Sequence, residues 1–136
     1  MLHPSARPEG PLRVVVVDAD ERVRASLCGL ICISGRIEIV GDAGQVGPAF
    51  DLVSAIAPDV VIVDPRLPDL DSGLAFIARL RARWPDVRIL AMSKSDAVEA
   101  AALASGADGV VHKTYRPSEL VAAIEAADGP AAGRSA

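Results

Sequence analysis

The chain has 136 residues, a length typical of one domain and sufficient to bury roughly two thirds of the surface of the unfolded chain. It carries 14 Lys and Arg against 18 Asp and Glu, and its basic residues do not cluster, which argues against direct binding of nucleic acid. No apolar run reaches the roughly 18 residues of a membrane span, and the N-terminus lacks the apolar core of a secretory signal, so we expect a cytoplasmic protein that binds no membrane.

The first half of the chain predicts three strands separated by two helices. In chain order the elements are a disordered lead-in at residues 1–11, a strand at 12–17, a helix from Asp20 to Gly35, a strand at 36–40, a helix at 45–57 and a strand at 60–63. Asp20 can cap the first helix, and Gly35 ends it. The last strand, Val-Val-Ile-Val, is β-branched throughout, which predicts a central strand buried on both faces that delivers Asp64 to a loop.

The second half continues the alternation of helices and strands. Its elements are a loop at 65–72, a helix at 73–84, a strand at 87–92, a helix from Ser95 to Gly106, a strand at 109–112, a helix that starts at Pro117, and a flexible tail or linker stub at 128–136. Pro85 prevents the helix before it from continuing, because a proline inside a helix removes a hydrogen bond.

This alternation predicts an α/β fold, because parallel neighbouring strands need a crossover, and right-handed crossover helices cover both faces of the sheet. We expect a flavodoxin-like, doubly wound sheet of five parallel strands in the order 2-1-3-4-5, with five helices, over residues 12–127. In that order the carboxyl ends of the first and third strands are neighbours at the point where such sheets bind ligands. Asp18 is therefore expected beside Asp64.

Polar residues follow four of the predicted strands and would face one crevice. They are Asp18 with Asp20, then Asp64, Ser93 and Lys113. A carboxylate can attack phosphorus and become an aspartyl phosphate if a divalent ion offsets the charge and a cation and a hydroxyl hold the phosphoryl oxygens. The residue types therefore favour phosphoryl transfer, with Asp64 as the acceptor.

At these positions the chain resembles the response-regulator receiver domain of two-component systems over residues 12–127. The matching blocks, in order and spacing, are Asp64 with Leu67, Pro68 and Gly73, then Ser93, residues 104–109 and Lys113. The resemblance implies that Asp64 takes a phosphoryl group from a sensor histidine kinase in a phosphorelay, and that Ser93 and Lys113 contact this group. It implies a signalling domain that is no enzyme beyond weak self-phosphorylation from small donors and self-dephosphorylation.

The resemblance also implies a bound Mg²⁺ and an output face. The metal ligands would be Asp64, an acid of the first loop, namely Asp18 and possibly Asp20, and the backbone carbonyl of Arg66. The output face would be built from the fourth helix, the fifth strand and the fifth helix, and would bind an output partner or a second copy of the chain.

Three positions depart from the pattern of the family. Ala19 stands where the second of two adjacent acids is usual, although Mg²⁺ keeps several waters and can be held by one or two protein carboxylates. Val110 replaces an aromatic residue that turns inward in the family's switch, and we expect a weaker switch. Lys94 follows Ser93 where a small residue is common, and its ammonium group either contacts the phosphoryl group or lies in water.

These departures leave a second hypothesis open. The chain could be a pseudo-receiver, an interaction module that keeps the fold and works without phosphate. Ala19, Val110 and Lys94 favour the pseudo-receiver. Asp64, Ser93 and Lys113 favour the phosphoacceptor.

Overall fold

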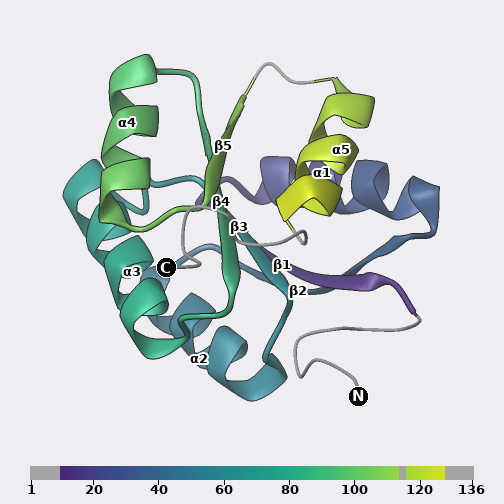
Figure 1. Cartoon of the computed structure of the whole chain (residues 1–136), viewed down its shortest axis with the longest axis horizontal. Helices are drawn as coiled ribbons and strands as arrows, with labels where there is room; N and C mark the ends of the chain where they lie inside the picture. The colour runs from purple at the N-terminus through teal and green to yellow at the C-terminus, as the bar shows by residue number, and fades with distance from the viewer. Residues whose placement is uncertain (1–9, 114–115, 128–136) are drawn as a thin grey trace.

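A five-stranded parallel sheet forms the centre of the molecule (Figure 1). The computed structural model of the chain describes residues 10–113 and 116–127. The strands are β1 (Leu12–Val17), β2 (Ile37–Ala43), β3 (Val60–Val63), β4 (Arg88–Ser93) and β5 (Gly109–His112). They pair in the order β2-β1-β3-β4-β5, which confirms the predicted fold and strand order.

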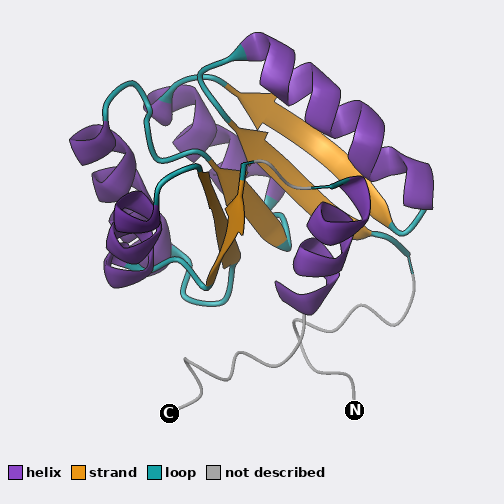
Figure 2. Ribbon diagram, turned by 90° about the horizontal axis from the view of Figure 1, so that it is seen from above, coloured by secondary structure: helices purple, strands orange, loops and turns teal. Residues whose placement is uncertain are grey.

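Helices cover both faces of this sheet (Figures 1 and 2). They are α1 (Glu21–Ile31), followed by a 3-10 turn η1 (Cys32–Ser34), then α2 (Val46–Ile56), α3 (Leu70–Arg83), α4 (Asp96–Ser105) and α5 (Pro117–Ala127). Figure 1 shows α2, α3 and α4 on one side of the sheet and α1 and α5 on the other. Among the described residues, no helix is long and apolar enough to cross a lipid bilayer.

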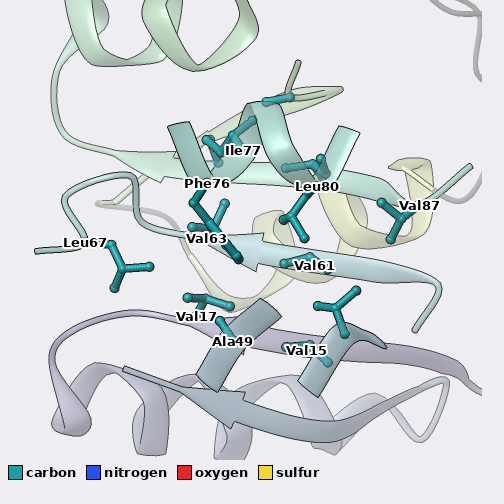
Figure 3. Close-up of a cluster of buried hydrophobic side chains, with 14 of the residues drawn as sticks. Val15, Val17, Ala49, Val61, Val63, Leu67, Phe76, Ile77, Leu80 and Val87 are labelled. Carbon is teal, nitrogen blue, oxygen red and sulfur yellow. The ribbon is translucent and has the colours of Figure 1, made fainter. Parts of the chain in front are cut away.

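Alternate residues of the strands supply two apolar cores, because successive side chains of a strand point to opposite faces. Val15 and Val17 of β1 pack with residues of α2, α3 and α4, whereas Val14 and Val16 pack with residues of α1 and α5. Figure 3 shows the first of these cores. Its labelled side chains are Val15, Val17, Ala49, Val61, Val63, Leu67, Phe76, Ile77, Leu80 and Val87. Both faces of the inner strands are therefore fixed by packing, which makes the strand ends a rigid base for polar side chains.

The helix ends mostly follow the predicted capping residues. Asp20 caps α1, Ser95 caps α4, and Gly35 ends the first helical segment in a left-handed conformation, with φ of 74°. Helix α3, however, begins at Leu70, three residues before the predicted start at residue 73. The reason is Asp69, whose side chain accepts a hydrogen bond from the backbone N–H of Ser72 at 2.8 Å and so caps the helix earlier.

Strand β2 also differs from the prediction, because it continues to Ala43 rather than ending at residue 40. A register shift between Val14 and Val15 lets the pairing of β1 with β2 continue past Val40. As a result Asp42 lies opposite Val16, close to the carboxyl end of β1. Strand β4 runs one residue later than predicted, and so includes Ser93.

The predicted lead-in and tail fall at the edges of the described part of the chain. Residues 1–9 and 128–136 lie outside the described residues, and residues 10 and 11 directly precede β1. The boundaries proposed from the sequence, 12–127, therefore stay a prediction.

Candidate functional site

The carboxyl ends of β1, β3 and β5 bring three charged side chains together. Val17 is the pairing partner of Val63, so the residues that follow them, Asp18 and Asp64, leave adjacent strands at the same level. The Nζ atom of Lys113 lies 2.5 Å from Oδ2 of Asp64 and 3.1 Å from Oδ2 of Asp18. The sheet thus places the three predicted residues in one cluster.

The three side chains differ in their access to solvent. The side chain of Asp18 is 3% exposed, that of Asp64 14% and that of Lys113 18%. Asp64 is therefore the carboxylate of this pair that a second molecule can reach more easily. One of its oxygens, Oδ1, accepts a hydrogen bond from the backbone N–H of Arg66 at 2.9 Å, which orients the carboxylate.

The environment of Lys113 keeps its side chain charged. Burial lowers the pKa of Lys113, but the hydrogen bonds from Lys113 to Asp64 and Asp18, and the negative charges of both, outweigh it, so the pKa is raised above its ordinary value. The site therefore contains a permanent ammonium group between two carboxylates. Such a group can also bind the oxygens of a phosphoryl group.

The hydroxyl of Ser93 connects the site to the start of α4. Ser93 is buried, with 6% exposure, and its backbone carbonyl accepts a hydrogen bond from the N–H of Lys113 at 2.7 Å. Its Oγ accepts a hydrogen bond from the N–H of Ser95 at 2.9 Å and lies 3.3 Å from the carbonyl oxygen of that residue. Ser95 in turn caps α4, so a movement of the Ser93 hydroxyl would change a hydrogen bond at the start of this helix.

The remaining predicted site residues, Asp20, Lys94 and Val110, have surroundings of three different kinds. The carboxylate of Asp20 accepts hydrogen bonds from the N–H groups of Arg22 and Val23, at 2.8 and 3.4 Å, and so acts as the cap of α1. The side chain of Lys94 is exposed. Val110 is half-buried and packs against the core under α2, α3 and α4.

The loop after Asp64 is held against α3 by a close backbone contact. A Cβ atom added to Gly73 would lie 1.4 Å from the carbonyl oxygen of Pro65, so only glycine fits at this position of the helix. Arg66, whose backbone carbonyl is a predicted metal ligand, is the next residue of this loop. The packing of α3 against Pro65 therefore fixes the path of the loop that carries Arg66.

Two charged residues that sequence reasoning missed lie behind Asp18. Nη1 of Arg24, on α1, donates a hydrogen bond to the backbone carbonyl oxygen of Asp18 at 2.6 Å, and its Nε lies 3.0 Å from Oδ1 of Asp42. Asp42 was missed because the predicted strand ended at residue 40. The one signal for Arg24 is its place one helical turn after the cap Asp20, which is too common to single it out.

The residues at this site fit a magnesium ion held by few protein ligands. Oδ2 of Asp18 is buried, and its negative charge faces the ammonium group of Lys113 at 3.1 Å, a contact whose angles fall short of a regular hydrogen bond. Hard oxygen donors of this kind suit Mg²⁺, which usually keeps several waters. In the described part of the chain, no three His, Cys, Asp or Glu side chains are grouped to hold a metal.

Comparison with known families identifies the class of this domain. The sequence model of the response regulator receiver domain matches residues 14–125. The chain belongs to this family, whose members are non-enzymatic signalling modules of two-component systems.

Curated relatives and solved structures agree with this assignment. The DNA-binding transcriptional activator DevR/DosR of Mycobacterium tuberculosis is 36% identical over 116 residues, which are 84% of this chain and 53% of that protein. The response regulator MprA of Mycolicibacterium vanbaalenii is 35% identical over 119 residues, 85% of this chain and 50% of MprA. The chain thus spans about half the length of these relatives.

Among solved structures, the signal receiver domain of NarL from Mycobacterium tuberculosis superposes with a TM-score of 0.80 at 31% identity. The alignment covers 90% of this chain and 100% of the NarL domain. A two-component response regulator of the LuxR family from Aurantimonas superposes with a TM-score of 0.80 at 32% identity. This alignment covers 92% of this chain and 88% of the Aurantimonas chain.

Proposed function

We propose that this domain accepts a phosphoryl group on Asp64 from a sensor histidine kinase in the cytoplasm, and so changes its contacts with other proteins. The observation that carries the proposal is the ion pair between the half-buried Asp64 carboxylate and Lys113, with Asp18 on the same ammonium group. In the reaction a carboxylate oxygen of Asp64 bonds to phosphorus as the bond from phosphorus to the donor nitrogen breaks, and the donor histidine keeps the electron pair.

Lys113 and Ser93 would hold the group once it has arrived. The ammonium of Lys113 stabilises negative charge on the phosphoryl oxygens, and it needs little reorganisation because it already lies against Asp64. The Ser93 hydroxyl would exchange its contact with Ser95 for one with a phosphoryl oxygen, which links the chemistry to the start of α4. Lys94 is exposed, which supports the alternative that its ammonium group lies in water.

A magnesium ion would be held by Asp18, Asp64 and the backbone carbonyl of Arg66. When bound, it would offset the repulsion between the carboxylates and the phosphoryl oxygens. Asp20 is the weaker candidate for a ligand, because its carboxylate already accepts two hydrogen bonds as the cap of α1. Asp18 is the better one, because its Oδ2 accepts no regular hydrogen bond among the described residues and faces Asp64 across the ammonium group of Lys113.

A second candidate function is the phosphate-independent pseudo-receiver. The ammonium group of Lys113 already contacts both Asp18 and Asp64, so one of the two negative charges is offset without a phosphoryl group or a metal. The absence of an acid at Ala19 points the same way. The two functions differ in one measurable property, the ability of Asp64 to become phosphorylated.

The test of the proposed function is incubation of the protein with Mg²⁺ and a small acyl phosphate, followed by intact mass spectrometry. The wild-type chain should gain one phosphoryl group, and Asp64→Asn should gain none. Asp51→Asn is a suitable control, because Asp51 is exposed on α2 and away from the strand ends. A wild-type chain that stays unmodified at high donor and metal, and with a histidine kinase as donor, would establish the pseudo-receiver instead.

For the output we propose a face made by α4, β5 and α5, over residues 97–105 and 118–126. On α4 this face includes Leu103, which is 46% exposed. Val110 of β5 is short, stiff and already half-buried, so it cannot sweep between exposed and buried positions as an aromatic ring can. Phosphorylation should therefore change the affinity for a partner or a second copy only several-fold, because the two states differ little.

Light scattering with and without beryllofluoride, a mimic of the phosphoryl group, measures this change for self-association. We expect at most a modest shift in mean mass. Complete conversion from monomer to dimer on adding the mimic would contradict the weak-switch hypothesis.

A further inference from the structure

Arg24 connects three elements behind the acidic pocket. It starts from α1, and its guanidinium reaches both the backbone at the end of β1 and the side chain of Asp42 on β2. The Arg24 side chain is 17% exposed, whereas Asp42 is 45% exposed. The guanidinium is therefore mostly enclosed, and its shortest contact, 2.6 Å, is with the carbonyl oxygen of Asp18.

The neighbouring backbone leaves space for this guanidinium. A Cβ atom at Gly44 would lie 2.6 Å from Nη1 of Arg24 and 3.5 Å from the carbonyl oxygen of Asp18. Any residue larger than glycine would therefore press on the contact between Arg24 and Asp18. The N–H of Asp18 also donates a hydrogen bond to the carbonyl of Ala43 at 3.1 Å, so β2 holds the N–H of Asp18 and Arg24 of α1 holds its carbonyl.

We propose that Arg24 is a positioning residue for the phosphoacceptor site. It fixes the backbone of Asp18 so that its carboxylate faces Lys113 and Asp64, and Asp42 fixes the orientation of Arg24. The position of Asp18 matters more in this chain because the next residue is Ala19, and the carboxylate of Asp20 is engaged as the cap of α1. An effect of Arg24 on phosphorylation rests on the proposed function. An effect of Arg24 on the Asp18–Lys113 ion pair does not.

The first test measures phosphorylation from a small acyl phosphate at several donor concentrations. Arg24→Ala should lower the limiting rate by roughly tenfold to a hundredfold, as expected for a shift of about 1 Å at a reacting group. The donor concentration at half-maximal rate should change little. Arg24→Lys should restore part of the rate, because an ammonium group keeps the charge and one of the two contacts.

Two further variants separate positioning from a general structural role. Gly44→Ala presses on the guanidinium without removing its charge, and should lower the limiting rate in the same direction as Arg24→Ala. Arg22→Ala is the matched control, because Arg22 lies two residues away on α1 with an exposed side chain, and it should leave the rate unchanged. Wild-type rates in both Arg24→Ala and Gly44→Ala, with a phosphorylated wild type, would overturn the proposal.

The second test is a double-mutant cycle in urea unfolding, which needs no phosphoryl donor. If Arg24 holds Asp18 toward Lys113, then Lys113→Ala should lower the urea midpoint less in the Arg24→Ala background than in the wild type. In the Arg22→Ala background its effect should be the same as in the wild type. Additive effects of Arg24→Ala and Lys113→Ala would overturn the positioning role even if Asp64 is phosphorylated. Coupling without any phosphorylation would keep that role and overturn the proposed function alone.

Discussion

Replacement of Gly73 by alanine tests the contact that holds the loop after Asp64 against α3. In a helix, Gly→Ala normally stabilises the fold by about 1 kcal/mol, because alanine loses less backbone freedom on folding. At Gly73 the added Cβ would lie 1.4 Å from the oxygen, 2.3 Å from the carbon and 2.8 Å from the Cα of Pro65. All three are backbone atoms, so no side-chain rotation relieves the overlap.

The size of the overlap decides which effect wins. An ordinary carbon–oxygen contact is about 3.3 Å, so the loop and the helix must separate by roughly 2 Å. Overpacking of a filled core typically costs about 1–3 kcal/mol, and more where backbone must move. The cost should exceed the gain from helix propensity, for a net loss of about 2 kcal/mol or more and a Tm lower by roughly 8 °C.

Thermal unfolding followed by circular dichroism measures this loss. Gly29→Ala is the matched control, because Gly29 lies inside α1 with nothing within 4 Å of an added Cβ. That variant should be more stable than the wild type, by about 0.5–1 kcal/mol. If Gly73→Ala were stabilised as much as Gly29→Ala, then the close approach of α3 to Pro65 would not exist in solution, and the account of the loop would be refuted.

Two further predictions concern charge at the site. Because the pKa of Lys113 is raised in the folded chain, its ion pairs contribute fully below its ordinary value of 10.5 and are lost as pH rises through the higher folded pKa. Urea unfolding between about pH 9 and pH 12 should therefore show a steeper alkaline loss of stability in the wild type than in Lys113→Met, and parallel curves would contradict this. Ala19→Asp should tighten Mg²⁺ binding by at least about tenfold, roughly 1.4 kcal/mol, and should lower the stability of the metal-free chain by adding a negative charge near Asp18 and Asp64. A magnesium titration that finds equal affinities would show that Asp20 already fills the role or that no metal binds.

The sequence predicts the central part of the site because strand ends are strongly marked in it. A run of β-branched residues followed by Asp64 predicts a buried central strand that ends at Asp64. The strand order then brings Asp18 beside Asp64. Local capping chemistry also predicts the starts of α1 and α4, since Asp20 and Ser95 are the residues that such helix ends prefer.

The parts that were missed depend on contacts between elements. The strand β2 continues to Ala43 because of an irregularity in its pairing with β1, and no local pattern announces this shift. Asp69 lies inside the predicted loop at 65–72, and it caps α3 by accepting a hydrogen bond from the N–H of Ser72, while Gly73 lets the first turn of the helix approach the backbone of Pro65. Arg24 and Asp42 meet because the longer strand β2 carries Asp42 to a position opposite Val16, near the end of β1.

We propose that Asp64, rather than its more deeply buried neighbour Asp18, receives the phosphoryl group. The most direct measurement is reduction of the phosphorylated chain with borohydride, which converts an aspartyl phosphate to homoserine, followed by peptide mass spectrometry. We expect homoserine at position 64 in the wild type and in Asp51→Asn, and no homoserine in Asp64→Asn. Homoserine at position 18, or none at any position after treatment with donor, Mg²⁺ and a histidine kinase, would contradict it.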